Sequence, residues 1–198
     1  YFQRDITRFI HAQMQNNYWE ENIEYEVKIN KGFTELRKSA YTCAKENILD
    51  FRTSPADKSN MAKYLFNGFS RCLYTEQRFD SDSERRFSTI LERDSIKWFK
   101  PIKGQFLIFY RHGHEQFEYQ PDFVAETENT IFMVEIKMRK ELEDPIVLAK
   151  KESAIKWCVN ATNHSSTYGG KPWKYLLIPH DEIAENITLL GMLERFSK

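Results

Sequence analysis

Two apolar runs separated by a short polar stretch predict an antiparallel hairpin in the second half of the chain. Residues 123–125 and 131–134 are apolar, whereas residues 126–130 between them are polar. Short runs of aromatic and β-branched residues on either side of a polar turn are typical of paired strands. We therefore expect two buried strands joined by a tight turn.

The register of this hairpin brings three charged side chains to one end. With Glu128 and Asn129 at the tip, the numbers of paired residues have a constant sum, so that Asp122 lies opposite Glu135. Lys137 follows further along the same face. Two carboxylates and an ammonium beside buried strands are unfavourable unless a cation offsets them, and Mg²⁺ prefers carboxylate oxygens. The pattern therefore predicts a divalent-metal site.

A helix with an inward-facing carboxylate is predicted upstream of the hairpin. Ser81 and Glu84 have the spacing of a capping box, and Phe87, Ile90 and Leu91 supply an apolar stripe. Glu84 lies on the same side of the helix as the stripe, so we expect its carboxylate to face the core. Two roles are open for Glu84, capping its own helix and contributing to the predicted site, and one carboxylate can serve both.

The remaining apolar pattern predicts an α/β fold. We expect a strand at residues 105–110, a turn at 111–114, a helix after Asp144-Pro145, a strand at 175–178 and a last helix at 182–193. The resulting order is helix, three strands, helix and strand, which indicates a mixed sheet flanked by helices. Two histidines in the predicted turn, His112 and His114, are better explained by solvent exposure than by a second metal site.

Residues 4–75 are predicted to form a mixed α/β connector, and residues 76–198 the domain that carries the site. Within the connector the spacing of apolar residues favours helices at 6–14 and 56–69 and a strand at 25–29. Tyr1-Phe2-Gln3 looks like the end of a cleaved expression tag. We therefore expect the natural chain to extend further toward its N-terminus.

Composition narrows the possible functions. The chain has 29 basic and 29 acidic residues and no net charge, whereas DNA-binding proteins usually carry a basic excess. Its 3 cysteines lack the paired spacing of a zinc site, and no phosphate-binding loop motif of a nucleotide-driven motor is present. No apolar run reaches membrane-spanning length, so we expect a cytoplasmic protein with no membrane partner. Local basic groups that could contact phosphates are Arg85-Arg86, residues 137–140 and Lys150-Lys151.

Pro121-Asp122 followed by Glu135-Ile136-Lys137 resembles the core motif of the PD-(D/E)xK nucleases. The resemblance implies a restriction-endonuclease-like core of order α-β-β-β-α-β, with an acidic residue on the first helix that Glu84 matches. It implies catalytic roles for Glu84, Asp122, Glu135 and Lys137, and Mg²⁺ ligands from the first three and the carbonyl of Ile136, with Mn²⁺ able to substitute. Many of these enzymes carry a glutamine on the helix after the core, but residues 150–153 here read Lys-Lys-Glu-Ser.

A closer resemblance covers nearly the whole chain. Several segments are similar to the C-terminal part of the Res subunits of type III restriction enzymes, which are superfamily 2 helicase-nucleases; they include residues 31–36, 50–52, 55–58, 79–93, 97–101 and 171–180. This resemblance implies a Mg²⁺-dependent endonuclease domain that acts on double-stranded DNA. It further implies an ATP-dependent helicase region in the same full-length protein and a methyltransferase subunit as a partner. The alternative is a nuclease-like domain that no longer cuts and instead binds DNA or a partner subunit.

Overall fold

The computed structural model describes residues 3–16, 35–184 and 186–196. The chain divides into two compact units, Tyr1–Lys31 and Gly32–Lys198. The described part of the first unit is a single helix, α1 (Gln3–Asn16), which confirms the helix predicted at residues 6–14. The strand predicted at residues 25–29 lies outside the described residues.

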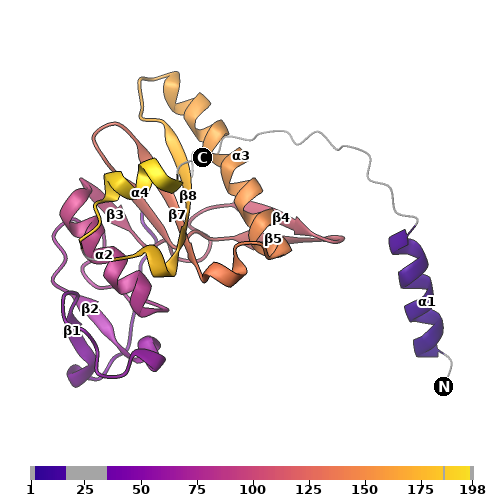
Figure 1. The fold of residues 1–198 in the computed structure, drawn as a ribbon, viewed down its shortest axis with the longest axis horizontal. Helices are drawn as coiled ribbons and strands as arrows, with labels where there is room; N and C mark the ends of the chain where they lie inside the picture. The colour runs from indigo at the N-terminus through magenta and orange to yellow at the C-terminus, as the bar shows by residue number, and fades with distance from the viewer. Residues whose placement is uncertain (1–2, 17–34, 185, 197–198) are drawn as a thin grey trace. The chain divides into compact units, whose positions relative to one another are not determined.

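The second unit is built around a four-stranded mixed sheet. Its strands are β3 (Lys97–Phe99), β6 (Phe123–Glu126), β7 (Ile131–Lys137) and β8 (Trp173–Pro179), and they lie in that order across the sheet (Figure 1). β6 runs antiparallel to both β3 and β7, whereas β7 and β8 are parallel. The predicted mixed α/β class is confirmed.

The β6–β7 hairpin has the predicted register. Phe123 pairs with Val134 and Glu126 with Ile131, and the amide of Thr127 donates to the carbonyl of Thr130 at 2.9 Å across the turn. Continuing this register beyond the end of β6 sets Asp122 opposite Glu135. The alternation of apolar and polar residues therefore determined which side chains meet at the end of the hairpin.

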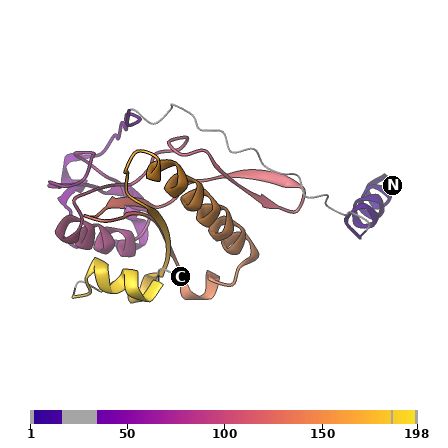
Figure 2. The ribbon, with the colours of Figure 1, turned by 90° about the horizontal axis from the view of Figure 1, so that it is seen from above.

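Helices cover both faces of the sheet, as Figures 1 and 2 show. α2 (Asp82–Asp94) and α4 (Leu189–Phe196) pack on one face, and α3 (Pro145–Ser166) packs on the other. Successive residues of β6 accordingly enter two different cores, because side chains alternate across a strand. Phe123 and Ala125 contact the first core, and Val124 contacts the second. Strands buried on both faces explain the nearly continuous apolar runs in the sequence.

One predicted strand and the turn after it differ from the structure. β4 (Ile108–His112) begins later than the strand expected at residues 105–110 and pairs with β5 (Glu115–Tyr119) in a separate two-stranded sheet. The place beside β6 belongs instead to β3, whose Trp98 is only 1% exposed and pairs with Ala125. The predicted turn at 111–114 is shorter as well, because residues 111 and 112 belong to β4 and Gly113, with φ of 62°, makes the turn.

The helix predicted at residues 56–69 is also wrong. This segment forms a 3-10 helix, η2 (Lys58–Lys63), followed by β2 (Leu65–Asn67), which is parallel to β1 (Ile48–Asp50). Tyr64, Leu65 and Phe66 are all buried. Consecutive side chains of a surface helix point in different directions, so such a helix would leave at least one of the three outside its apolar stripe. Phe66 packs in the same core as Phe87 and Phe123. The role predicted for residues 4–75, a connector beside a helicase, stays a prediction.

The last helix is shorter than predicted and begins at Leu189 rather than at residue 182. Its first amide donates to the carboxylate of Asp94 at 2.8 Å, which fixes the start of α4 against the end of α2. A short 3-10 helix, η4 (His180–Glu182), ends at the residue where the predicted helix was expected to begin. Two further 3-10 helices are η1 (Lys45–Asn47) and η3 (Arg139–Glu141). None of the helices described in the structure is both long and apolar enough to cross a membrane.

Ser81 caps the start of α2 as predicted, whereas the return hydrogen bond of the predicted capping box joins Glu84 to the residue before the cap. The Oγ atom of Ser81 accepts a hydrogen bond from the Glu84 amide at 3.2 Å. The Glu84 carboxylate in turn accepts from the amide of Asp80, also at 3.2 Å. Glu84 is 6% exposed, so the carboxylate caps the helix from its buried side.

Replacing Ser81 by alanine is expected to lower the free energy of unfolding by about 1 kcal/mol, because the Glu84 amide loses its acceptor at the helix start. Urea denaturation followed by circular dichroism measures this change. Ser81→Thr keeps the hydroxyl and is the matched control, for which we expect a loss of about 0.5 kcal/mol or less. Equal losses in the two variants would show that the cap contributes nothing specific.

Candidate functional site

Asp122 lies at the start of β6 and is tied to the backbone of β7. Its Oδ2 atom accepts a hydrogen bond from the amide of Ile136 at 2.8 Å. Burial and the negative charge of Glu135 raise the pKa of Asp122 to about 6, although Lys100 and Lys137 act in the opposite direction. An aspartate with a raised pKa beside a second carboxylate marks a place where a further positive charge would be favourable.

Glu135 is the central buried carboxylate of the cluster. It is 3% exposed, and both of its oxygens have partners. Oε1 lies 2.7 Å from the Nζ atom of Lys137, and Oε2 accepts a hydrogen bond from the hydroxyl of Tyr119 at 3.0 Å. Burial and the charge of Glu135 raise the pKa of Tyr119 well above its ordinary value, so that this phenol remains a proton donor. Tyr119 therefore orients Glu135 through a hydrogen bond between residues distant in the sequence.

Lys137 completes the group predicted from the hairpin register. Burial alone would lower the pKa of its ammonium, but Glu135 and Asp122 raise it above the ordinary value. The ammonium is therefore charged at neutral pH, and its side chain is 25% exposed, so that it faces both the carboxylates and solvent. The structure thus brings Asp122, Glu135 and Lys137 together, as the register predicts.

Glu84 reaches the same cluster from α2, where it is paired with Lys100. The Nζ atom of Lys100 lies 2.5 Å from Oε2 of Glu84 and 2.8 Å from Oδ2 of Asp80. Burial and the negative charge of Asp122 raise the pKa of Glu84, whereas the positive charge of Lys100 lowers it. The net effect is a raised pKa. Sequence reasoning missed Lys100, whose one visible feature is its position directly after β3 in the segment Lys97-Trp98-Phe99-Lys100-Pro101.

The donor set of this cluster is suited to a small divalent cation. In the described part of the chain, no group of three or more His, Cys, Asp or Glu side chains is arranged to hold one ion together. Mg²⁺ does not need such a group, because it is commonly held by one or two carboxylates and keeps several waters. Asp122 and Glu135, with the carbonyl of Ile136 in the second half of the motif, could supply that kind of hard-oxygen set.

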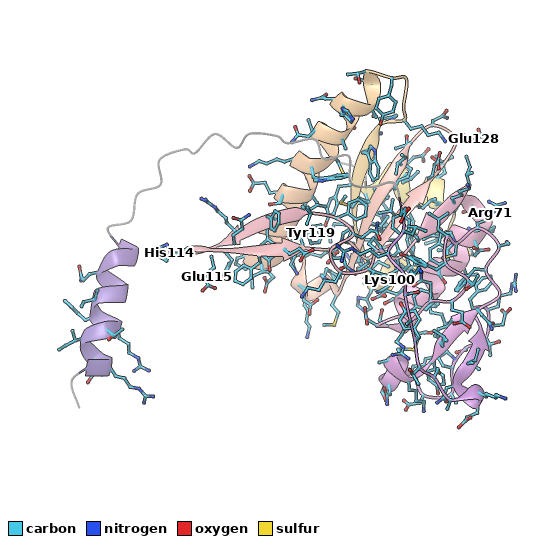
Figure 3. All side chains as sticks on the ribbon, turned by 180° about the vertical axis from the view of Figure 1, so that it is seen from behind. Arg71, Lys100, His114, Glu115, Tyr119 and Glu128 are labelled. Atoms are coloured by element: carbon cyan, nitrogen blue, oxygen red, sulfur yellow. The ribbon has the colours of Figure 1, made fainter. Side chains whose placement is uncertain are left out.

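Other features of the surface lie away from this cluster. Figure 3 shows Tyr119 and Lys100 within the body of the second unit and His114 at the outer end of the β4–β5 hairpin, well apart from them. A surface pocket lies near the turn of the β6–β7 hairpin and is lined by residues that include Arg71 and Glu128. The pocket contains none of the predicted site residues, so it does not bear on their chemistry.

Comparisons with protein-family models, with curated proteins and with solved structures found no match to this chain. The function proposed below therefore depends on the residues of the cluster, on their contacts and on the order of the elements that hold them.

Proposed function

We propose that this protein is a metal-dependent deoxyribonuclease that hydrolyses phosphodiester bonds at the cluster of Asp122, Glu135 and Lys137. One observation carries the proposal. The Asp122 carboxylate is hydrogen-bonded to the backbone of the segment Glu135-Ile136-Lys137, so that the two halves of the motif lie side by side at one end of the sheet. Two carboxylates and an ammonium in this arrangement suit the binding of a hard cation next to an anionic phosphate.

The order of elements supports a PD-(D/E)xK core as the finer description of the fold. α2 is followed by β3, β6 and β7 as an antiparallel set, then by α3 and by β8, which is parallel to β7. This is the order α-β-β-β-α-β that the resemblance implies, with the β4–β5 hairpin inserted between its first two strands. The sequence motif thus sits on the elements that such a core requires.

Each residue of the cluster has a distinct task in the proposed reaction. Asp122, Glu135 and the Ile136 carbonyl hold Mg²⁺ or Mn²⁺, and Tyr119 keeps Glu135 in position. The ion, when bound, supplies positive charge that polarises a phosphate oxygen and makes a water more acidic. Lys137 orients the attacking water and stabilises the charge that develops on the phosphoryl oxygens. The water oxygen forms a new bond to phosphorus, the bond to the leaving sugar oxygen breaks, and the leaving oxygen takes up a proton. For Glu84, the resemblance leaves open a part in holding a second ion.

The cellular setting is proposed on the resemblance alone. It consists of double-stranded DNA as substrate, an ATP-dependent helicase region in the same full-length protein, and a methyltransferase subunit as partner. A cytoplasmic location stays a prediction. The experiments below need none of these partners, because they address the chemistry of the described residues.

A catalytically silent domain that binds DNA or a partner is the second candidate. The observation that favours it is the balance of charge: Lys100 and Lys137 already pair with Glu84 and Glu135, and the chain as a whole has no net charge. Under that alternative, the cluster would stabilise the fold and would show no response to divalent cations.

Nicking of supercoiled plasmid separates these two candidates. We expect the purified protein to convert supercoiled DNA to open circles in Mn²⁺ and, more slowly, in Mg²⁺, and to leave it intact in EDTA. Mn²⁺ is expected to work better because Mg²⁺ requires a nearly ideal octahedral site. Plasmid that remains supercoiled in both metals at high protein concentration would favour the silent domain.

The isolated chain is expected to bind duplex DNA weakly. Its zero net charge leaves few surplus cations to displace counterions from phosphates, so we expect a Kd of about 10⁻⁴ to 10⁻⁶ M at physiological salt. Fluorescence anisotropy with unrelated duplexes at several salt concentrations measures this affinity. Nanomolar, sequence-selective binding would show that DNA recognition resides within these residues and would contradict the connector role of residues 4–75.

A further inference from the structure

Lys100 is a second buried lysine in the cluster, and the proposed reaction assigns it no task. Its side chain is 14% exposed, and its ammonium contacts the carboxylates of Glu84 and Asp80. The ammonium also lies 5.8 Å from the centre of the Phe123 ring, next to Asp122 in the sequence. Lys100 therefore projects from the end of β3 into the same group of side chains that holds Asp122.

Two carboxylate–ammonium pairs flank Asp122. Glu135 is paired with Lys137 on one side, and Glu84 is paired with Lys100 on the other. Burial alone would lower the pKa of Lys100, but Glu84, Asp122 and Asp80 raise it, so its ammonium is charged at neutral pH. Both pairs are therefore ion pairs, whereas Asp122 forms no ion pair with a lysine in the described part of the chain.

The charges of this group favour one divalent ion over two. Four carboxylates, on Asp80, Glu84, Asp122 and Glu135, and the two ammonium groups of Lys100 and Lys137 together carry two negative charges, although Asp80 is mostly exposed. One divalent cation would balance these charges. A second divalent cation would leave an excess of positive charge in a largely buried site, and such an excess is unfavourable.

The contacts of Glu84 also place Lys100 where a second ion would bind. Oε2 of Glu84 accepts from Lys100 at 2.5 Å and from the Asp80 amide at 3.2 Å. An ion that took this oxygen as a ligand would have to displace the ammonium from a buried position. Displacement would leave the ammonium without its carboxylate partner and so would carry its own cost.

We propose that Lys100 takes the place and the charge of a second divalent cation beside Glu84, so that the site binds one ion, between Asp122 and Glu135. The inference rests on the proposed metal-dependent function and assigns the ion to Asp122 and Glu135 rather than to Glu84. Glu84 then acts through Lys100 as a positioning residue, and Lys100 contributes positive charge near the phosphate without being a metal ligand.

Counting the Mn²⁺ ions bound by the full chain tests this proposal. Isothermal titration calorimetry and the electron paramagnetic resonance signal of free Mn²⁺ both give the number of ions without DNA and without activity. We expect the wild type to bind one ion. Lys100→Met keeps the length of the side chain but removes its charge, and we expect this variant to bind a second Mn²⁺ because Glu84 and Asp80 then face Asp122 without a cation.

Three further variants test whether the number of bound Mn²⁺ ions depends on the charge of Lys100 and on the carboxylate of Glu84. Lys97→Met removes the same charge from an exposed position on the same strand and is expected to bind one ion, like the wild type. Lys100→Gln can keep a hydrogen bond to Glu84 and should also bind two ions; it replaces Lys100→Met if circular dichroism shows that the latter does not fold. The double variant Glu84→Gln with Lys100→Met should return to one ion, because a ligand of the second site is lost.

The possible outcomes separate this inference from the proposed function. Two ions bound by the wild type, or one ion bound by folded Lys100→Met and Lys100→Gln, would overturn the inference and leave the metal-dependent function in place. No ion bound by the wild type would overturn the metal-dependent function, and the inference with it. One ion in the wild type and two in both folded Lys100 variants would support the proposal.

Discussion

Lys137→Ala is expected to lower the rate of metal-dependent DNA cleavage by at least about 10²-fold, the loss that follows removal of one group that stabilises transition-state charge. The ammonium of Lys137 lies 2.7 Å from Glu135 and is the charged donor at the solvent-accessible side of the cluster. Alanine removes that donor but leaves Tyr119 bonded to Glu135. Initial rates of plasmid nicking at saturating Mn²⁺ measure the effect.

Lys174→Ala is the matched control, because Lys174 is exposed and lies in β8 opposite Phe132, toward the other end of the sheet from Lys137. The control is expected to cut at the wild-type rate. Thermal unfolding of each variant shows whether a lost rate reflects a lost fold. Equal nicking by wild type, Lys137→Ala and Asp122→Ala, in preparations free of contaminating nuclease, would contradict the catalytic assignment.

Asp122→Asn is expected to make the metal-free protein about 3 kcal/mol more stable than the wild type near pH 8 and to remove most of its stabilisation by Mn²⁺. Burial and the charge of Glu135 raise the pKa of Asp122 from an ordinary value of 3.8 to about 6 in the folded protein. Asparagine keeps an oxygen for the Ile136 amide and lacks the charge. The substitution therefore relieves the repulsion between residue 122 and Glu135, and it also removes the negative charge of a proposed metal ligand.

The sign of the pH dependence follows from the direction of this shift. Because the folded protein holds the proton of Asp122 more tightly than the unfolded chain does, the stabilising contribution is complete below about pH 3.8 and is lost as the pH rises through about 6. The difference in stability between wild type and Asp122→Asn should accordingly be small near pH 4 and largest above pH 7. Denaturant titrations across this range measure it.

Glu128→Gln is the matched control for this prediction. Glu128 is exposed in the turn at the far end of the same hairpin, as Figure 3 shows, and the substitution removes the same charge. We expect neither a gain in metal-free stability nor a loss of the Mn²⁺ response. A Mn²⁺-induced rise in Tm that survives in both Asp122→Asn and Glu135→Gln would place the ion elsewhere.

The hairpin and its charged end could be predicted because they depend on local pattern. Apolar residues on both sides of a polar turn determine the register, and the register alone sets Asp122 opposite Glu135. The start of α2 could be predicted in the same way, since the Ser81 hydroxyl accepts from the Glu84 amide only three residues later. Neither inference required knowledge of contacts between distant segments.

The errors arose where tertiary contacts decide the structure. Met61, Leu65 and Phe69 are spaced by four, as in an amphipathic helix, but Leu65 lies in a short strand beside β1. The apolar run at residues 105–110 was assigned to the main sheet, whereas the less regular Lys97–Phe99 occupies that position. Lys100 was missed for a similar reason: its partners Glu84 and Asp80 come from α2 and the residues before it, and sequence spacing does not reveal such a contact.

The position of a bound metal tests the central claim most directly. Crystals of the chain soaked in MnCl₂ should show anomalous density between the carboxylates of Asp122 and Glu135, with Lys100 still paired to Glu84. The same soak of Asp122→Asn crystals should show no density at that position. Wild-type crystals with saturating Mn²⁺ and no density between Asp122 and Glu135, or with density only at other positions, would contradict the assignment of this cluster as a metal-dependent nuclease site.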